Sequence, residues 1–184
     1  MLYEFKELID PKMLPNRRRY LNYYIVGLVD GEGCFSVSIK KQDNTKFGWT
    51  IDPVFHVTQN KEHLVVLKIL KRVFNCGRII AKPGQEASTL QYVVDNRRHL
   101  AEKILPFFRK HKPIIKWKEF ERFSEIVESL ERGDHRNLEG FKKLLEKAYE
   151  MSANRKYRLN EIISEVERRV GRLRGHTLGA VEGP

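Results

Sequence analysis

The sequence predicts an α+β fold with the element order helix, strand, strand, helix, strand, strand, helix, followed by C-terminal helices. Three observations support this prediction. Apolar residues recur at helical spacing in several segments, they alternate with polar residues in two pairs of shorter segments, and turns rich in glycine, proline or asparagine separate them. Two such strand pairs form an antiparallel, saddle-shaped sheet. We expect helices to cover one face of this sheet, while the other face stays polar and basic.

The first helix is expected over residues 20–29, which read YLNYYIVGLV. A helix that is apolar on most sides must be buried on more than one face. Glycine inside a helix is unfavourable, so Gly27 indicates that another backbone approaches closely there. Residues 30–33 read DGEG and are expected to end the helix, with glycine in the left-handed conformation that is common at helix C-termini.

The first strand pair is marked by a change to two-residue periodicity. Residues 34–40 alternate between apolar and polar side chains, and so do residues 50–58 after a turn around residues 43–44. Pro53 has no N–H to donate to a ladder, so it predicts a bulge or an edge position in the second strand.

The remaining elements follow from the same two periodicities. We expect helices at 62–74 and 97–108, strands at 77–82 and 89–95, an amphipathic helix around residues 120–130, and charged helices over 138–172 with a break near residue 152. The predicted organisation is one domain over residues 1–184. Its core covers about 20–130, C-terminal helices occupy 131–175, and 176–184 form a frayed tail.

The composition limits the class of protein. The chain has 184 residues, of which 41% are hydrophobic and 10% aromatic, so it can bury a core and is not expected to be disordered. Two cysteines are too few for a disulfide scaffold or a four-cysteine zinc site. No apolar run reaches the ~20 residues of a membrane span, and no signal-peptide pattern begins the chain. We therefore expect an intracellular protein of the cytoplasm, nucleoid or organelle matrix.

The charge balance indicates an anionic partner. The chain has 35 Lys and Arg against 24 Asp and Glu, a formal net charge of +11, and nucleic acid is the commonest partner of such proteins. A ribosomal or simply soluble basic protein would have the same balance.

The polar face of the predicted strands carries side chains that can hydrogen-bond to base edges and phosphates in a DNA major groove. Any one of them could instead be an ordinary solvated residue, so the prediction depends on the whole face. The candidate DNA-binding residues are Ser36, Ser38, Lys40, Gln42, Thr50, Asp52, His56, Thr58, Arg78, Lys82 and Gln91.

Two carboxylates stand at the C-terminal end of the first helix, where the helix dipole disfavours negative charge. A cation would offset this cost. Carboxylates together with water and phosphate oxygens suit Mg²⁺. Asp30 could alternatively make local hydrogen bonds within the turn. Glu32, between two glycines, has no such local role.

Residues 25–33, IVGLVDGEG, resemble the LAGLIDADG motif of homing endonucleases, and the helix and strand order that follows strengthens the resemblance over residues 20–130. The resemblance implies a site-specific endonuclease that cuts both strands of a long DNA duplex by metal-dependent hydrolysis. It places a metal at the last acidic position, Glu32, beside Gly31. Mg²⁺ is the expected ion, with Mn²⁺ as a substitute and Ca²⁺ as an inactive one.

Only one copy of the motif is present, and the resemblance therefore implies a homodimer with a roughly palindromic target. In this family two motif helices pack together, and small residues permit their close approach. One Glu32 from each chain would then meet near the twofold axis, with cuts across the minor groove. The implied interface residues are Tyr24, Gly27, Leu28, Asp30 and Gly31.

The resemblance also implies other active-site residues. Gln59 would orient a water molecule, and His63 would take a basic position found in some relatives, although it could equally be a solvent-facing histidine at a helix start. The spacing from Pro113 favours Lys118 as the active-site lysine, whereas an ungapped match of the following helix favours Lys116. Either lysine could instead lie on the surface near phosphate.

Two rival functions use the same scaffold. A maturase would bind intron RNA, and a non-catalytic regulator would bind DNA without cutting it; the acidic Glu32 argues against the regulator. The absence of flanking splicing motifs favours an intron-encoded enzyme over an intein.

Overall fold

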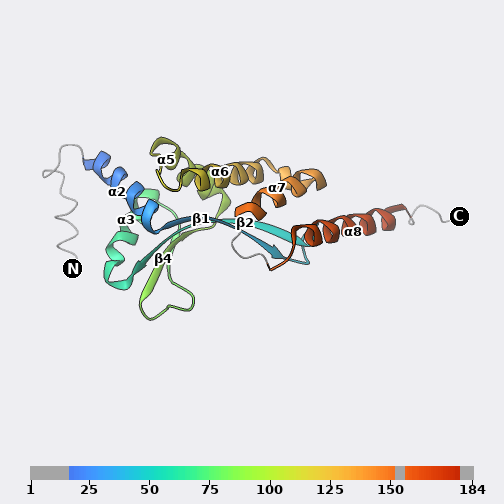
Figure 1. Ribbon diagram of the computed structural model, residues 1–184, viewed down its shortest axis with the longest axis horizontal. Coiled ribbons are helices and arrows are strands. Elements are labelled where there is room, and N and C mark those ends of the chain that lie inside the picture. Colours follow the sequence, from blue (N-terminus) through green and yellow to red (C-terminus); the bar gives the residue numbers. More distant parts are fainter. Residues whose placement is uncertain (1–16, 152–155, 179–184) are drawn as a thin grey trace. The chain divides into compact units, whose positions relative to one another are not determined.

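The computed structural model describes residues 17–151 and 156–178, and its helices and strands follow the predicted order (Figure 1). The predicted α+β class is confirmed. The elements are α2 Arg17–Glu32, β1 Gly33–Lys41, β2 Trp49–Asn60, α3 Leu64–Phe74, β3 Arg78–Ala81, β4 Thr89–Val94, α4 Arg97–His99, α5 Leu105–Lys110, α6 Trp117–Arg132, α7 Leu138–Met151 and α8 Leu159–Leu178. Short 3₁₀ turns occur at Lys61–His63 and Asp134–Arg136. The backbone of α8 continues to Leu178, past the predicted end, and 179–184 of the predicted tail lie outside the described residues.

The described chain divides into two compact units. The first contains residues 17–35 and 54–121, and the second contains 36–53 and 122–178. Strands β1 and β2 each contribute residues to both units. The expectation of one domain over residues 1–184 stays a prediction.

The four strands form one sheet in the order β1-β2-β4-β3. Strand β4 pairs antiparallel with β2 from Phe55–Val94 to Asn60–Thr89, and antiparallel with β3 from Arg78–Val93 to Ala81–Leu90. Pro53 precedes the first β2–β4 pair, so its missing N–H costs this ladder nothing. Strand β2 lies between β1 and β4, so the bulge or edge position expected at Pro53 stays a prediction.

Aromatic rings dominate the core of the first unit. Phe55 is fully buried and stacks on Phe35 at a centroid distance of 5.2 Å. Phe108 contacts both rings edge-on or tilted, at 5.2 and 5.5 Å. Helix α3 adds Leu67, Leu70 and Phe74, and it ends where Asn75 takes the left-handed conformation with φ of 48°.

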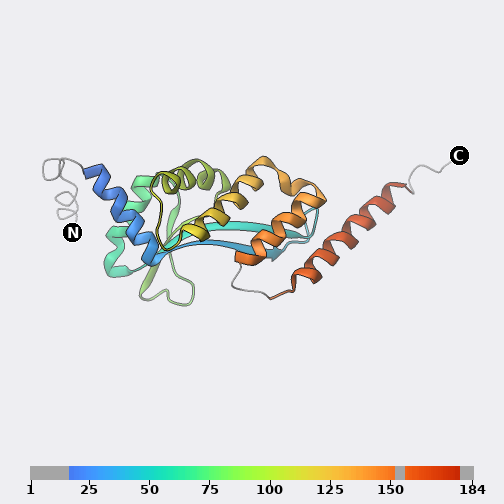
Figure 2. The same ribbon diagram turned by 45° about the horizontal axis from the view of Figure 1, so that its top comes forward.

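The second unit has its own apolar core. Figure 2 shows α7 running beside the C-terminal part of α6. Phe123 and Val127 of α6 are buried, as are Leu145 of α7 and Val166 of α8. Phe47, in the turn between β1 and β2, stacks on a ring of α7 and is itself 4% exposed. The amphipathic helices predicted for the C-terminal segment therefore bury their apolar faces here.

The end of α2 departs from the sequence prediction. The helix continues through Glu32, and the described glycines with positive φ are Gly48, Gly77, Gly84 and Gly133, so the left-handed cap expected within residues 30–33 is wrong. Glycine is required at position 33 for a different reason. A Cβ on Gly33 would lie 2.7 Å from Val29 Cγ1 and 2.8 Å from the Val29 carbonyl oxygen. The turn from helix to strand therefore needs Gly33 for space.

The helix predicted over residues 97–108 is interrupted. Residues Leu100–Ile104 form a π-helical turn between α4 and α5. Pro106 is the second residue after this turn. It cannot donate an N–H, and in a regular α-helix its ring clashes with the carbonyl four residues earlier. The wider turn relieves this conflict. Among the helices of the described ranges, none is both long and apolar enough to cross a membrane.

Candidate nucleic-acid interface and acidic turn

Asp30 is held by the backbone of a distant segment. Its carboxylate accepts hydrogen bonds from the N–H groups of Ile114 at 2.8 Å, Ile115 at 3.2 Å and Lys116 at 3.1 Å. These residues lead into α6, so Asp30 satisfies donors that precede the helix. Backbone N–H groups from outside the turn therefore offset the negative charge of Asp30 at the end of α2.

Glu32 differs from Asp30 in having no such partner. The side chain is exposed, and within the described ranges no hydrogen bond or ion pair reaches its carboxylate. Those ranges also contain no group of three or more His, Cys, Asp or Glu residues that could hold a metal ion. The Glu32 carboxylate and the carbonyl of exposed Gly31 are hard oxygen donors of the kind Mg²⁺ prefers. One chain therefore offers a fitting but incomplete ligand set.

The described residues bury one apolar face of helix α2 and leave the other exposed. Ile25 and Val29 are 0% exposed, whereas Tyr20 and Tyr24 are 55% and 48% exposed. A Cβ added at Gly27, or at Gly31 one turn later, would meet no heavy atom within 4 Å. Among the described residues, therefore, no backbone approaches Gly27 closely, and they leave this face of the helix open.

The other predicted active-site residues lie at the ends of elements in the first unit. Gln59 is half-buried near the end of β2, opposite Leu90, and His63 is exposed before α3. Lys118 is exposed in the first turn of α6. Lys116 is half-buried, and its N–H is one of the three bound by Asp30. Asp30 thereby ties the segment carrying both lysines to the helix that ends in Glu32.

The strand register places four predicted DNA-binding residues of the first unit on one face of the sheet. His56 and Thr58 lie opposite Val93 and Gln91 of β4, and Arg78 also lies opposite Val93. Gln91 Nε2 donates to Thr58 Oγ1 at 3.0 Å. Burial alternates along most of β2, as predicted for residues 50–58.

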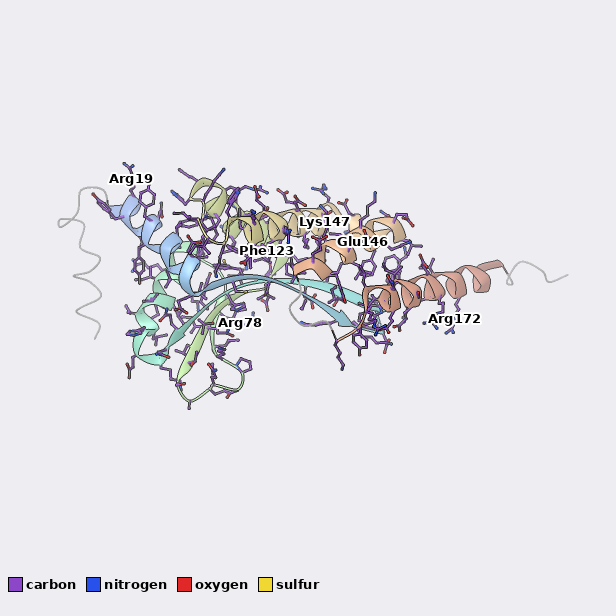
Figure 3. The ribbon with its side chains drawn as sticks, in the orientation of Figure 1. Arg19, Arg78, Phe123, Glu146, Lys147 and Arg172 are labelled. Carbon is purple, nitrogen blue, oxygen red and sulfur yellow. The ribbon has the colours of Figure 1, made fainter. Side chains whose placement is uncertain are left out.

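Two side chains of this face have shifted pKa values. The pKa of His56 is lowered by burial and, to a smaller extent, by Lys82. Arg78, labelled in Figure 3, donates twice to Asp95 at 2.6 Å, and this bond raises the pKa of its guanidinium. Asp95 is not among the predicted site residues. Its position just beyond the end of β4 is a sequence signal that could have suggested a partner for Arg78.

The predicted DNA-binding residues of the second unit also interact with one another. Lys40 Nζ lies 3.2 Å from the Asp52 carboxylate, to which Thr50 Oγ1 donates at 3.5 Å. Ser38 Oγ donates to the Asp52 carbonyl oxygen at 3.5 Å. Ser36 is half-buried and Gln42 exposed. The polar face is therefore an ordered arrangement of side chains across two strands.

A polar, basic strand face together with an exposed carboxylate at a helix end is typical of a protein that binds nucleic acid and a metal ion. Comparison with known proteins gives the family. Residues 25–127 match the sequence model of the LAGLIDADG endonucleases. The chain belongs to this family of DNA endonucleases, and the predicted resemblance is confirmed.

Individual relatives support this assignment. The homing endonuclease I-ApeII of Aeropyrum pernix is 38% identical over 149 residues, which cover 79% of this chain and 87% of the relative. The DNA endonuclease I-CeuI of Chlamydomonas moewusii is 35% identical over 63% of this chain and 55% of its own length.

Solved structures of homing endonucleases support the same family assignment. The archaeal intron-encoded homing endonuclease I-Vdi141I, complexed with DNA, has a TM-score of 0.78 and 37% identity, covering 83% of this chain and 98% of that one. The homing endonuclease I-TnaI has a TM-score of 0.70 and 33% identity, and the match covers 79% of this chain and 97% of that one.

Proposed function

We propose that two copies of this chain form an intron-encoded homing endonuclease that cuts both strands of a long, roughly palindromic DNA site with the help of Mg²⁺. The open face of α2 is the observation that carries this proposal. Tyr20, Tyr24 and the two glycines at which a Cβ would meet nothing form a continuous strip along the helix. A second α2 helix packed on this strip would bury the exposed rings, and the small residues would let the two backbones approach closely.

A dimer of this kind would complete the ligand set that one chain lacks. The strip includes Gly31, which is next to Glu32, so a twofold axis along α2 would bring two Glu32 carboxylates toward the same place. Glu32 and the Gly31 carbonyl would hold the metal together with DNA phosphate oxygens. A bound Mg²⁺ would lower the pKa of an attacking water and neutralise charge that develops on the phosphate.

The neighbouring side chains would position the reaction. The Gln59 amide can orient a water molecule through its donor and acceptor atoms. Lys118 would offset phosphate charge, with Lys116 as the alternative, and His63 could contribute a further donor. The hydrogen bonds that Asp30 accepts from the N–H groups of residues 114–116 would keep the segment carrying Lys116 and Lys118 in place relative to the end of α2 during these steps.

Binding would come from the polar strand face. Its hydroxyl, amide and basic side chains would hydrogen-bond to base edges in the major groove and to phosphates, and affinity should fall steeply with salt. The structure of the intron-encoded relative I-Vdi141I is a complex with DNA, which supports DNA as the partner of this chain.

Cleavage-site mapping on a randomised duplex DNA library tests the proposal. With Mg²⁺ we expect paired cuts on opposite strands, related by a twofold axis within one recurring site, and with EDTA or Ca²⁺ we expect none. Cuts without twofold symmetry would contradict the dimer. Binding to structured RNA without any DNA cleavage would contradict the endonuclease and favour a maturase.

A further inference from the structure

The turn between β1 and β2 is held by helix α8 through two ion pairs within the second unit. Lys41 Nζ lies 2.6 Å from Glu165 Oε1, and the bond lowers the pKa of Glu165 and raises that of Lys41. One turn further along α8, Arg169 donates to the Asp43 carbonyl oxygen and lies 4.0 Å from its carboxylate. We call residues 36–53 the hairpin.

These two ion pairs also fix the register between helix and hairpin. Along the hairpin the order of charge is Lys41 then Asp43, and along α8 it is Glu165 then Arg169. Sliding α8 by one turn would place Glu165 against Asp43, or Arg169 against Lys41, and like charges would repel. Each pair is weak alone because it is largely exposed, but opposite polarity in two adjacent pairs favours one alignment.

Arg169 also packs on the hairpin backbone. Gly48 ends the turn with φ of +75°, and a Cβ there would lie 3.0 Å from Arg169 Nη1 and 3.4 Å from its Cδ. Gln42 N–H donates to the Gly48 carbonyl oxygen at 2.8 Å and closes the loop. The arginine therefore lies against the closed end of the hairpin and contacts it through both charge and surface.

The opposite side of the turn is anchored as well. Lys46 Nζ donates to the Arg136 carbonyl oxygen at 3.0 Å, and Phe47 stacks on Phe141 at 4.7 Å. Trp49 is 2% exposed and meets Tyr157 edge-on at 5.1 Å.

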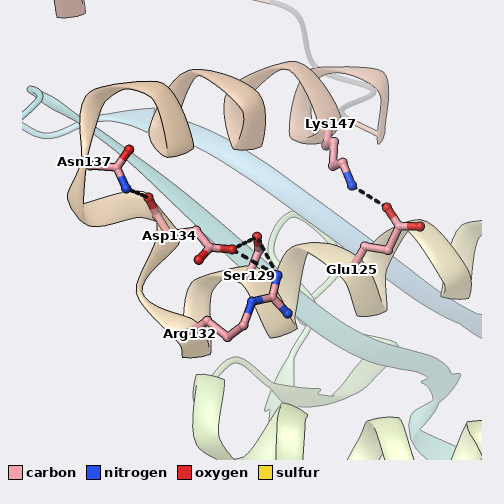
Figure 4. A network of polar contacts seen from close by, with 6 residues as sticks. All are labelled: Glu125, Ser129, Arg132, Asp134, Asn137 and Lys147. Atoms are coloured by element: carbon pink, nitrogen blue, oxygen red, sulfur yellow. Dashed lines mark hydrogen bonds and ion pairs between the residues drawn. The ribbon is translucent and has the colours of Figure 1, made fainter.

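The segment that receives Lys46 is itself fixed, as Figure 4 shows. Asp134 accepts hydrogen bonds from Ser129 Oγ and from Arg132 Nη2, the latter at 3.0 Å, and Asn137 Nδ2 donates to its carbonyl oxygen at 3.2 Å.

We propose that α8 is a positioning element for DNA recognition and that Arg169 is its principal positioning residue. An isolated two-stranded hairpin is marginally stable in water, and binding is stronger and more selective when the recognising residues are ordered beforehand. The hairpin carries Ser38, Lys40 and Asp52, which interact across its two strands. By fixing the closed end, α8 holds these side chains in one arrangement before DNA arrives. This inference rests on the proposed DNA-binding role of the hairpin.

Arg169→Ala and the matched variant Arg172→Ala test the inference in the full chain. Both changes remove one arginine from α8, but Arg172, labelled in Figure 3, is exposed and makes no hydrogen bond or ion pair with the described residues of the hairpin. Hydrogen exchange measured by mass spectrometry reports on the amides of residues 38–50. Cleavage of a randomised duplex library with Mg²⁺ reports on base selectivity. Arg169→Lys, which keeps the positive charge, tests whether a conservative substitution restores slow exchange and base selectivity.

We expect Arg169→Ala to speed exchange in residues 38–50 by about three- to fivefold, as the loss of a partly exposed charged contact predicts. Selectivity should fall over one contiguous stretch of each half-site, with little change in maximal cleavage rate. Arg172→Ala should change neither measurement, and Arg169→Lys should restore part of both.

Equal behaviour of the two alanine variants would overturn the inference, and so would faster exchange without any loss of selectivity. If the wild-type chain cut no DNA, the proposed function would fail instead, and the exchange data would still show whether Arg169 holds the hairpin. Thermal unfolding of Arg169→Ala identifies a variant that is merely unfolded. In that case Arg169→Lys, which keeps a cation opposite Asp43, should restore folding together with part of the slow exchange and selectivity, and restored folding without restored selectivity would overturn the inference.

Discussion

The acidic turn at residues 30–33 and the hairpin at residues 36–53 both carry charges, but they use them differently. In the hairpin, Lys40, Lys41 and Asp43 each have a partner of opposite charge within the second unit. In the acidic turn, Glu32 has no ion-pair or hydrogen-bond partner among the described residues. A recognition surface benefits from order before binding, whereas a metal-binding carboxylate must remain available to its ion.

The acidic turn itself contains the same contrast at closer range. Asp30 and Glu32 are two residues apart, yet Asp30 accepts three backbone hydrogen bonds and Glu32 accepts none within the described ranges. The two carboxylates should therefore differ in what they contribute. Asp30 should affect stability, and Glu32 should affect catalysis.

The largest predicted effect is that of Glu32→Gln on cleavage. We expect the rate to fall at least about 10³-fold, equivalent to about 4 kcal/mol, because a neutral amide is a poor ligand for a divalent cation. DNA binding measured by fluorescence anisotropy in Ca²⁺ should persist. The exposed Glu150→Gln, with the same charge change, should cleave normally. Cleavage by Glu32→Gln at the wild-type rate would show that Glu32 does not bind the catalytic metal.

Gly27→Arg should abolish dimer formation while leaving the monomer folded. A Cβ at Gly27 would meet no heavy atom of the described residues within 4 Å. In a helix interior, arginine has a higher helix propensity than glycine, by roughly 0.8 kcal/mol. Sedimentation velocity should show a monomer for this variant and a dimer for Gly171→Arg, whose Cβ also meets open space. Two dimeric variants would show that the open face of α2 is not the interface.

Asp30→Ala should lower the free energy of unfolding by about 1–2 kcal/mol, because N–H groups before α6 lose their charged acceptor. Urea denaturation followed by circular dichroism measures this change. Glu32→Gln is the control, and its unfolding free energy should equal or slightly exceed that of the wild type, because it removes an unpaired negative charge from the C-terminal end of α2. If the two variants were equally stable, Asp30 would not be the structural member of the pair.

The smallest predicted effect concerns pH. The pKa of His56 is lowered in the folded chain, so the unfolded chain binds more protons as pH falls below the ordinary histidine value of about 6.5. The stability that depends on neutral His56 is therefore complete above that pH and is lost below it. We expect a loss of less than about 1 kcal/mol for this half-buried group.

His56→Gln should flatten part of the pH dependence in urea titrations between pH 5 and pH 8. The pKa of His111 is lowered as well, so the His111 contribution should remain in this variant. An unchanged dependence in His56→Gln would place the titrating group elsewhere.

Periodicity predicted most of the fold, because the side chains that create it act within one helix or strand. The predicted strands at 77–82 and 89–95 lie within two residues of β3 and β4, and α3 ends at residue 74 as predicted. The π-helical turn at Leu100–Ile104 was missed, although Pro106 is a local signal for it.

The missed features depend on contacts that no local pattern contains. The partners of Asp30 are 84 to 86 residues away, and the clash that requires Gly33 depends on the path of the chain from α2 into β1. The contact of Arg169 with the hairpin spans 126 residues. By contrast, the carboxylate of Glu32 stood out in the sequence because glycines flank it, and those neighbours offer no side-chain partner.

Cleavage by mixed dimers tests most directly whether one chain is half of an active site. Wild-type chains and Glu32→Gln chains, each with a different affinity tag, are co-expressed, and the mixed species is purified through both tags. Its products are then measured on a supercoiled plasmid that carries the mapped site. If each chain supplies one Glu32, the mixed species should nick one strand at a time and release open-circular plasmid, whereas wild-type dimers release linear plasmid. Linear product from mixed dimers at the wild-type rate would contradict the account.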